Sequence, residues 1–578
     1  MPKRTQKIIY IYGFILILAL ARTAYLQLWN GPNSGFALAE KALKYRTQAL
    51  AGEEYCRGEI LDRNLLSLTD SGIRPVVAVY PTNISNIPDT AQNLASFLGL
   101  EKSHIENLIK RGKENYGVRA PVIIKTNLTA TEISEIEKLK NPGVTVLPLK
   151  TRYGPHALAT HIIGYLNSID GKQWEKLTLE RRTAESNGAL PTAYKITDKI
   201  GVAGLEGKYE QVLKGSRPQD RIIAITDGSG RILPGIGTRV QEEVNDPWRN
   251  HLVLTLDKKY QEIVERVMDQ EITRGAVAVI DIPTGDVLAC ASRPNFKQDE
   301  IYKYLSGGDE LLDRCGRVAF YPGSVFKMVI AAGVLEEKLV TTSEEFQCRG
   351  AHLFADQTEI KCLSEHGTVD LADAISRSCN TTFVQLGLRL GGAKLAEYAA
   401  KLGFTISVGS NSPPALVGNA AIGQEGVLVS PLQIANLYAT LGRNGYYRPW
   451  RIVSEIRNYQ GDVIQEYPGK PPVQVISENT CEILIKDLTR AVQAGSGKQA
   501  WLQEGGTAGK TGTAQANDTN RVIAWFAGFT PVENPQLAIA VMVEEDTHGL
   551  YTGLRGGETA APVFKKIVEQ INDLRLYP

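Results

Sequence analysis

A short turn followed by an apolar helix constrains the fold of this chain more than any other stretch. Residues 321–327 read Tyr-Pro-Gly-Ser-Val-Phe-Lys, and the run from Met328 to Leu335 is apolar on every side. Pro-Gly favours a turn, and a helix without a polar face must be buried. Ser324 is expected in the first helical turn, with Lys327 three residues later on the same face. The sequence therefore predicts a hydroxyl and an amine side by side in a domain core.

Such a pair favours acyl-transfer chemistry. The N-terminus of a helix stabilises negative charge, and a buried lysine loses its proton more readily than an exposed one. A serine nucleophile with a lysine base is one known way to transfer an acyl group. Ser-x-x-Lys is nevertheless a short pattern, and in most proteins it is only a helix start beside a solvated lysine. Other parts of the chain must decide between these two interpretations.

Length and composition indicate a large folded protein. The chain has 578 residues, of which 43% are hydrophobic and 22% charged, and this suggests three or four structural units. The net charge is +1, without basic blocks beyond the N-terminus, so no nucleic-acid partner is expected. Seven cysteines are too few for a disulfide scaffold, and none forms a Cys/His cluster with the usual zinc spacing. We therefore expect no metal and no other cofactor, and interpret Gly495 to Lys498, which lacks the full P-loop pattern, as a loop.

The N-terminus predicts a membrane anchor. A basic tail, residues 1–7, precedes an apolar run at 8–28 with aromatic residues near both ends. This run is long enough to cross about 30 Å of hydrocarbon as a helix. The alternative is a cleaved signal peptide, because Ala19-Leu20-Ala21 resembles a signal peptidase site. Both interpretations place the bulk of the chain outside the cytoplasmic membrane; the retained anchor predicts a single-pass membrane protein with a cytoplasmic N-terminus.

Two regions of different composition follow the anchor. Residues 35–250 are mixed and carry no acid–base cluster, which predicts an elongated, non-catalytic α+β pedestal with strands at 75–80 and 221–225 and helices at 90–98, 102–110 and 129–139. Residues 251–578 begin with a strand at 252–256, a helix at 258–272 and a hairpin turning at Pro283-Thr284-Gly285. Helices at 371–402 and 431–441 follow, then strands at 511–514, 522–529 and 536–544 and a final helix at 561–572. This order predicts an α+β domain whose sheet comes from both ends and encloses a helical insertion.

Two further stretches of this second region carry side chains that are suited to catalysis or substrate binding. Ser378-Cys379-Asn380 places a hydroxyl and an amide two residues apart near a predicted helix start. Lys510 to Ala514 reads Lys-Thr-Gly-Thr-Ala and opens a strand after several glycines, which within strands mark close approach of another backbone. A strand edge with a lysine and two hydroxyls suits an extended peptide that ends in a carboxylate. Each stretch alone is more often an ordinary turn or a solvated strand.

Taken together and in this order, the three motifs resemble those of the penicillin-binding proteins and serine β-lactamases. Ser378 follows Ser324 by 54 residues, and Lys510 follows Ser378 by 132, intervals similar to those of the transpeptidases. The N-terminal motifs at 57–63, 161–165 and 201–206 resemble the pedestal of class B penicillin-binding proteins, which are monofunctional peptidoglycan D,D-transpeptidases. That family has an antiparallel sheet with helices on both faces and a helical subdomain. The resemblance covers nearly all of the chain beyond the anchor.

The resemblance implies a role for each motif residue. Ser324 would attack the penultimate D-Ala carbonyl of a stem peptide, and Lys327 would accept its proton. Ser378 and Lys510 would relay a proton to the leaving amine, while Asn380 would hold Lys327 and the substrate amide. The backbone N–H groups of Ser324 and Thr513 would form the oxyanion hole, and the strand residues Thr511, Gly512 and Thr513 would help to bind the substrate. β-Lactams would acylate Ser324, and a polytopic glycan polymerase of the wall-synthesis machinery would be the membrane partner.

Other functions within this family are a β-lactamase, a β-lactam sensor and a scaffold of the wall-synthesis complex. The first of these needs water to release the acyl group, and class A enzymes use a Glu-x-x-Leu-Asn loop that does not occur between Asn380 and Lys510. A sensor of this family usually has several membrane spans or a cytoplasmic signalling part. A scaffold role is compatible with catalysis. The sequence does not separate division, elongation and sporulation enzymes.

Cys348 and Cys362 flank a short polar segment just before the second motif. We expect that these two cysteines are able to form a disulfide, which would tie the order of the active site to the extracytoplasmic redox state. The alternative is that both are small apolar residues of a loop. Cys379 is expected only to pack in the core.

Overall fold

The computed structural model describes residues 3–28, 47–50, 57–115, 121–186, 194, 198–215, 220–225, 238–242, 248–516, 521–546 and 554–576. The chain divides into two compact units, each made of separate segments. The first comprises Met1–Arg57, Ser71–Gly154 and Ser216–Asp246, and the second Gly58–Asp70, Pro155–Gly215 and Pro247–Pro578. This division differs from the expected boundary between residues 250 and 251. One reason is the strand β2 (Ile60–Leu61), which pairs in parallel with β10 (His251–Leu254) of the second unit.

The first unit contains two three-stranded sheets, with strand orders β4-β3-β5 and β1-β8-β9. The expected strands at 75–80 and 221–225 and the three expected helices are confirmed. The strands are β1 (Thr47–Leu50), β3 (Gly72–Val79), β4 (Val122–Lys125), β5 (Val144–Thr151), β8 (Asp220–Ile225) and β9 (Thr238–Glu242), and the helices α1 (Lys3–Leu28), α3 (Ile87–Leu98), α4 (Lys102–Asn115) and α5 (Ala130–Lys138). A search of the described residues finds no helix with the length and apolar character that crossing a membrane requires.

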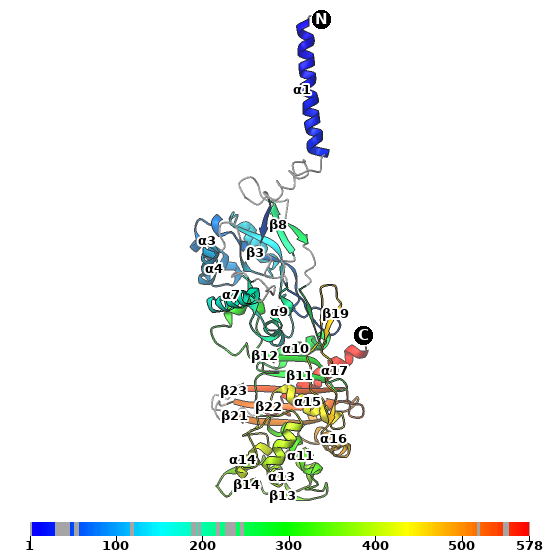
Figure 1. Cartoon of the computed structure of the whole chain (residues 1–578). Coiled ribbons are helices and arrows are strands. Elements are labelled where there is room, and N and C mark those ends of the chain that lie inside the picture. Colours follow the sequence, from blue (N-terminus) through cyan, green and yellow to red (C-terminus); the bar gives the residue numbers. More distant parts are fainter. Residues whose placement is uncertain are drawn as a thin grey trace. The chain divides into compact units, whose positions relative to one another are not determined.

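A five-stranded antiparallel sheet organises the second unit, in the order β12-β11-β23-β22-β21 (Figure 1). The first two strands come from the start of this region and the other three from its end, which confirms the sheet built from both ends. The predicted hairpin is also confirmed, since β11 pairs with β12 around residues 283–285. The strands are β11 (Gly275–Asp281), β12 (Val287–Arg293), β21 (Ala508–Ala516), β22 (Arg521–Thr530) and β23 (Leu537–Asp546). Strand β21 therefore lies at one edge of the sheet.

Helices cover both faces of this sheet. On one face α10 (Lys258–Glu271) and α17 (Ala560–Leu576) share a hydrophobic core with the odd-numbered valines of β11 and with Phe526. On the other face α15 (Pro431–Gly442) packs on β11, β22 and β23, where the strands present small side chains such as Ala278 and Ala540. Small residues on a sheet let a helix approach closely, and a capping box of Ser430 and Gln433 fixes where α15 begins.

The helical insertion lies beyond the β21 edge of the sheet (Figure 1). Its helices are α11 (Lys327–Glu336), α12 (Leu371–Ser376), α13 (Asn380–Lys401) and α14 (Pro414–Ala421), followed by α16 (Glu478–Gln493). Two short hairpin-like pairs join it, β13 (Phe346–Cys348) with β16 (Gly367–Val369) and β14 (Ala351–Leu353) with β15 (Glu359–Lys361). The predicted helix at 371–402 is thus broken at Ser378, where φ is +58°, and α13 is kinked again at Gly391, where φ is +76°.

Most of the remaining elements of the second unit are short, and the exception is α7, with 16 residues. They are the helices α6 (Thr160–Ile163), α7 (Gly171–Ser186), α8 (Gly204–Lys208) and α9 (Glu210–Leu213), the 3-10 helices η4 (Gln298–Lys303), η5 (Gly323–Phe326) and η6 (Lys498–Ala500), and the strands β6 (Leu166–Ser168), β7 (Lys199–Gly201), β17 (Tyr446–Tyr447), β18 (Val453–Arg457), β19 (Val463–Glu466) and β20 (Val473–Gln474). Of these, η5 carries Ser324.

Candidate active site

The turn that carries Ser324 packs directly on strand β21. Gly323 has φ +57°, and a Cβ there would lie 2.7 Å from the carbonyl oxygen of Thr513. A Cβ on Gly512 would lie 2.8 Å from the carbonyl oxygen of Pro322. Only glycines leave room for two backbones at this separation. Ser324 therefore lies in a 3-10 turn just ahead of α11, rather than in the first turn of α11 itself, and close to the Lys-Thr-Gly strand.

Lys327 is fully buried and its amine faces the second motif. Its Nζ donates hydrogen bonds to the carbonyl oxygen of Ser378 at 2.9 Å and to Oδ1 of Asn380 at 2.8 Å. The hydroxyl of Ser378 lies at 3.5 Å from the same nitrogen. Burial lowers the pKa of Lys327 to about 7. A lysine with this pKa is partly neutral at neutral pH and is able to accept a proton.

The second motif is positioned where α13 begins. Ser378 adopts the left-handed backbone region, which a non-glycine residue enters at a cost of about 1–3 kcal/mol and which is common at functional sites. Asn380 is the first residue of α13, and its Nδ2 donates to the carbonyl oxygen of Lys361 at 2.9 Å. Its amide oxygen and amide nitrogen thus connect Lys327 to the last residue of β15.

The third motif lies on the sheet edge, as the sequence predicts. Lys510 is completely buried, and its Nζ donates to the carbonyl oxygen of Thr511 at 3.1 Å. Burial, and then the nearby charge of Lys327, hold the pKa of Lys510 well below its usual range. The hydroxyls of Thr511 and Ser496 lie 2.6 Å apart. Thr513 is exposed along the same edge.

A pocket of about 400 Å³ brings the motifs together. Ser324, Ser378, Asn380 and the strand residues 511–513 line it, while Lys327 and Lys510 are buried and do not line it. Sequence reasoning missed several other lining residues, namely Leu363, Arg377, Ser496, Lys498, Gln499, Arg555 and Glu558. Ser496 and Lys498 belong to the segment interpreted as a plain loop. The glycines around them were the available signal, since glycine-rich loops often border sites.

A cluster of sulfur and imidazole groups adjoins the second motif. One ligand atom each from Cys348, Cys362, His366 and Cys379 lies within 4.8 Å of all the others. The test of zinc spacing missed this cluster because its members come from three separate segments of the chain, and only Cys362 and His366 are close in sequence. The expected Cys348–Cys362 disulfide is not formed here, since both thiols are free; it stays a prediction for oxidising conditions.

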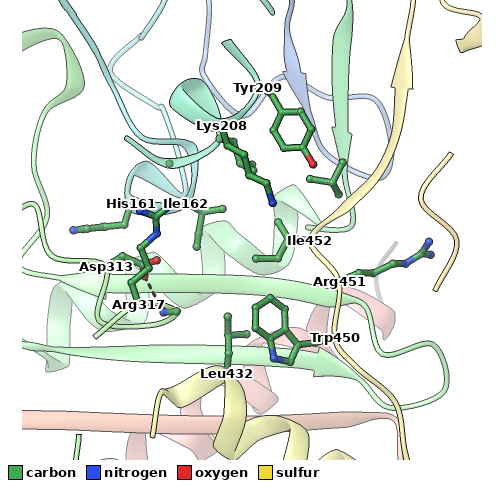
Figure 2. Close-up of a pocket in the computed structure, with 14 residues that line it drawn as sticks. His161, Ile162, Lys208, Tyr209, Asp313, Arg317, Leu432, Trp450, Arg451 and Ile452 are labelled. Atoms are coloured by element: carbon green, nitrogen blue, oxygen red, sulfur yellow. Dashed lines mark hydrogen bonds between the residues drawn. The ribbon is translucent and has the colours of Figure 1, made fainter. Parts of the chain in front are cut away.

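A second pocket of about 350 Å³ lies apart from these motifs (Figure 2). Lys208, Tyr209, Arg317 and Trp450 are among its labelled side chains, and Asp313 accepts a hydrogen bond from the backbone N–H of Gly316 at 2.9 Å. None of the three motifs contributes to this pocket. It is therefore separate from the site that the motifs form.

Comparison with known families agrees with this geometry. The family model of the penicillin binding protein transpeptidase domain matches residues 275–569, and that of the penicillin-binding protein dimerisation domain matches residues 54–245. The first match alone covers half of the chain. The chain therefore belongs to the penicillin-binding protein transpeptidase family. With a dimerisation domain ahead of the transpeptidase domain, it is a class B penicillin-binding protein of the D,D-transpeptidase type.

Similar proteins extend over most of the chain. Stage V sporulation protein D of Bacillus subtilis is 27% identical over 97% of this chain and 84% of its own length. Peptidoglycan D,D-transpeptidase MrdA of Acinetobacter baumannii is 26% identical over 96% of this chain and 87% of its own length. Peptidoglycan D,D-transpeptidase FtsI of Escherichia coli is 25% identical over 75% of this chain.

Proposed function

We propose that this protein crosslinks peptidoglycan stem peptides through an acyl-enzyme on Ser324. The observation that carries this proposal is the convergence of all three motifs on one pocket beside a sheet edge. If the Ser-x-x-Lys pair were only an ordinary helix start, nothing would require the other two motifs to lie in the same pocket. The family to which the chain belongs supports the same reaction.

The first step forms a bond between Ser324 Oγ and the penultimate D-Ala carbonyl carbon. Lys327, with a pKa lowered to about 7 by burial, takes the hydroxyl proton. The tetrahedral oxyanion is stabilised by the backbone N–H groups of Ser324 and Thr513. Collapse of this intermediate breaks the bond to the terminal D-Ala, whose nitrogen receives a proton through Ser378 and Lys510. The buried amine of Lys327 and the amide of Asn380 hold this chain of groups in place.

In the second step Ser324 Oγ is the leaving group, where it was the nucleophile in the first. The amine of another stem peptide attacks the acyl carbon, gives up a proton, and displaces Ser324 Oγ, which is reprotonated. Strand β21 supports the binding of the stem peptides, because an extended peptide adds to a sheet edge by backbone hydrogen bonds. Lys510, Thr511 and Thr513 bind the terminal carboxylate, and Gly512 leaves room for the close approach. β-Lactams bind in the same way and acylate Ser324.

The same proposal includes a membrane location. Residues 8–28 form a single transmembrane anchor with the tail 1–7 in the cytoplasm. In support, α1 spans Lys3–Leu28, and large apolar side chains between Ile11 and Leu20 are exposed. Residues 35–250 form the non-catalytic pedestal and 251–578 the catalytic domain. Membrane-embedded glycan polymerase and other wall-synthesis proteins are the partners, so a scaffold role accompanies catalysis.

A β-lactamase function is the rival for the same pocket. It requires fast hydrolysis of the acyl-enzyme, and the chain lacks the Glu-x-x-Leu-Asn loop between Asn380 and Lys510. The lifetime of the acyl-enzyme separates the two functions. A long-lived adduct is expected for a transpeptidase, and rapid turnover is expected for a β-lactamase.

The test uses the full chain purified in detergent. It is mixed with a fluorescent penicillin, and the adduct is located by peptide mass spectrometry and followed after free drug is removed. The proposal expects a stable adduct on Ser324 and release of D-Ala from a stem peptide when an acceptor amine is present. Rapid loss of the adduct supports hydrolysis instead, and absence of any adduct on Ser324 contradicts both enzymatic functions.

A further inference from the structure

Three backbone hydrogen bonds fix the chain just ahead of Ser324. The N–H and carbonyl groups of Phe320 pair with those of Val429 at 2.8 and 2.9 Å, and the N–H of Gly323 donates to the carbonyl oxygen of Gly423 at 2.8 Å. A Cβ on Gly423 would lie 2.1 Å from the carbonyl oxygen of Gly323, so this approach requires a glycine. These contacts hold the backbone that leads into the turn.

Two buried aromatic side chains hold two further carbonyl groups of the same segment. The hydroxyl of Tyr438 in α15 donates to the carbonyl oxygen of Val325 at 3.1 Å. The indole Nε1–H of Trp525 in β22 donates to the carbonyl oxygen of Tyr321 at 3.0 Å. Both donor side chains are completely buried. The accepting carbonyls belong to residues on either side of Ser324, whereas both donors lie outside the three motifs.

Trp525 reaches the turn because it lies opposite a glycine. Strands β21 and β22 pair Gly512 with Trp525, and the side chains of directly paired residues lie on the same face of a sheet. A Cβ on Gly512 would lie 2.8 Å from the carbonyl oxygen of Pro322 and 3.2 Å from Cβ of Trp525. Because residue 512 has no side chain, the turn packs on this face, within reach of the indole.

Stability alone would account for these two contacts, because buried tyrosine and tryptophan side chains usually find a hydrogen-bond partner. The position of the two acceptors favours an effect on catalysis as well. In the proposed mechanism Oγ of Ser324 attacks and its N–H binds the oxyanion, so both depend on the backbone angles at one residue. A displacement of about 1 Å in an active site slows a reaction about 100-fold. Because the two carbonyls flank Ser324, release of either one lets this backbone move.

We propose that Tyr438 and Trp525 are positioning residues, which orient the Oγ and the N–H of Ser324 by holding the carbonyl groups on either side of it. Neither side chain is among those that line the active-site pocket, so the effect passes through the backbone. The inference rests on the proposed function, since it concerns the same serine. The oxyanion hole serves both the formation and the loss of the acyl-enzyme, so both steps slow when either donor is removed.

The first test removes one hydroxyl. The full chain in detergent is mixed with fluorescent penicillin at several concentrations in a stopped-flow instrument. Tyr438→Phe keeps the ring and should lower the acylation rate constant about tenfold, with penicillin binding unchanged and every molecule still reactive. Tyr398→Phe is the matched control, because it removes the hydroxyl of another buried tyrosine, which donates to Oε1 of Glu337 at 2.9 Å. This control should react at the rate of the unmodified protein.

The second test removes the indole N–H. Trp525→Phe should slow acylation about 10- to 100-fold. Trp501→Phe loses the same atoms from a half-buried tryptophan on the α10 and α17 side of the sheet, and it should not slow acylation. Hydrolytic loss of the adduct should slow by a similar factor in Tyr438→Phe and in Trp525→Phe. The pH dependence of acylation should stay the same, because Lys327 is unchanged in both.

Three results overturn the proposal. One is an acylation rate constant in either variant that equals that of the unmodified protein. Another is a smaller fraction of reactive molecules at an unchanged rate constant, which a purely structural role predicts. The third is a change in penicillin binding alone. The unmodified protein tests the proposed function separately: without acylation of Ser324 there, the function and this inference both fail, whereas acylation there with equal rates in the variants refutes the inference alone.

Discussion

The two halves of the active-site pocket are held in place by different forces. The turn of Ser324 and strand β21 are fixed by steric contact, since glycines at 323 and 512 let the two backbones touch. The second motif, Ser378 to Asn380, is held by hydrogen bonds to an amine and to a sulfur atom. Steric contact does not change with conditions, whereas the polar contacts respond to the protonation of Lys327 and to oxidation of Cys362. The first half therefore supplies a rigid nucleophile, and the second half makes its activation adjustable.

Loss of the nucleophile should have the largest effect. Ser324→Ala should reduce the rate of acylation by penicillin about a millionfold, because no other group in the pocket takes its place. The melting temperature should stay unchanged, since this side chain is only half-buried at the rim of the pocket. Stopped-flow acylation and thermal unfolding measure the two quantities. Residual labelling at another residue would show that the nucleophile has been misassigned.

The steric half is tested by adding one carbon atom. Gly512→Ala should lower the free energy of unfolding by about 1–3 kcal/mol, because the new Cβ meets the Pro322 carbonyl. Acylation should slow by about 100-fold as the oxyanion hole shifts. Gly409→Ala is the control, because a Cβ there meets nothing within 4 Å. Equal behaviour of the two variants in urea unfolding would contradict the steric account.

The polar half is tested at Asn380. Asn380→Ala removes the acceptor of the buried Lys327 amine and should slow acylation about 10- to 100-fold, with the fold retained. The rate is measured at several penicillin concentrations to separate binding from acylation. The change should fall on the acylation step. A change in binding alone would mean that Asn380 acts on the ligand and not on Lys327.

The rate of acylation should depend on pH through the protonation of Lys327, whose amine holds the second motif. Its pKa is lowered to about 7, so the neutral amine that accepts the proton is lost as the pH falls. Acylation should therefore decrease about tenfold per pH unit well below pH 7 and become constant well above it. Circular dichroism over the same range serves as the folding control. An inflection near the normal lysine pKa would show that burial does not tune this amine.

The smallest effect is expected where a residue outside both halves contacts strand β21. Ser496→Ala removes the hydroxyl that lies 2.6 Å from that of Thr511 and should weaken acylation by about fivefold. The apparent affinity for penicillin should account for most of this change, because Thr511 helps to bind the carboxylate. Thr511→Ser keeps a hydroxyl and should behave almost as the unmodified protein. A larger loss in acylation rate than in affinity would place Ser496 in the proton relay.

Much of the catalytic domain is encoded locally and was predictable. The hairpin of β11 and β12 follows from Pro283-Thr284-Gly285 between apolar runs, and the edge strand follows from the Lys-Thr-Gly pattern. The 3-10 turn ahead of α11 was not predicted, because its cause is the contact of Gly323 with a strand almost two hundred residues away. The break at Ser378 has a similar origin in tertiary contacts.

Residues brought together by folding alone were missed. Arg555 and Lys498 border the pocket only because folding brings their segments beside the motifs, and their sequence neighbours give no chemical pattern. Cys348, Cys379 and the segment from Cys362 to His366 come together only in the folded chain, so their spacing in the sequence forms no regular pattern. The packing of residues 58–70 and 155–215 in one compact unit with the C-terminal part was also not predicted. Long-range contacts of this kind leave no periodic trace in the chain.

The position of β21 at the sheet edge has a consequence for self-association. Most proteins protect an exposed edge with a bulge, a proline or a charged side chain that faces outward. Here the edge carries Gly512 and Thr513, and the lysine of the strand points inward and is buried. These protections would also exclude an incoming peptide. An enzyme that recognises its substrate by strand addition therefore keeps open an edge to which strands of other chains are able to add.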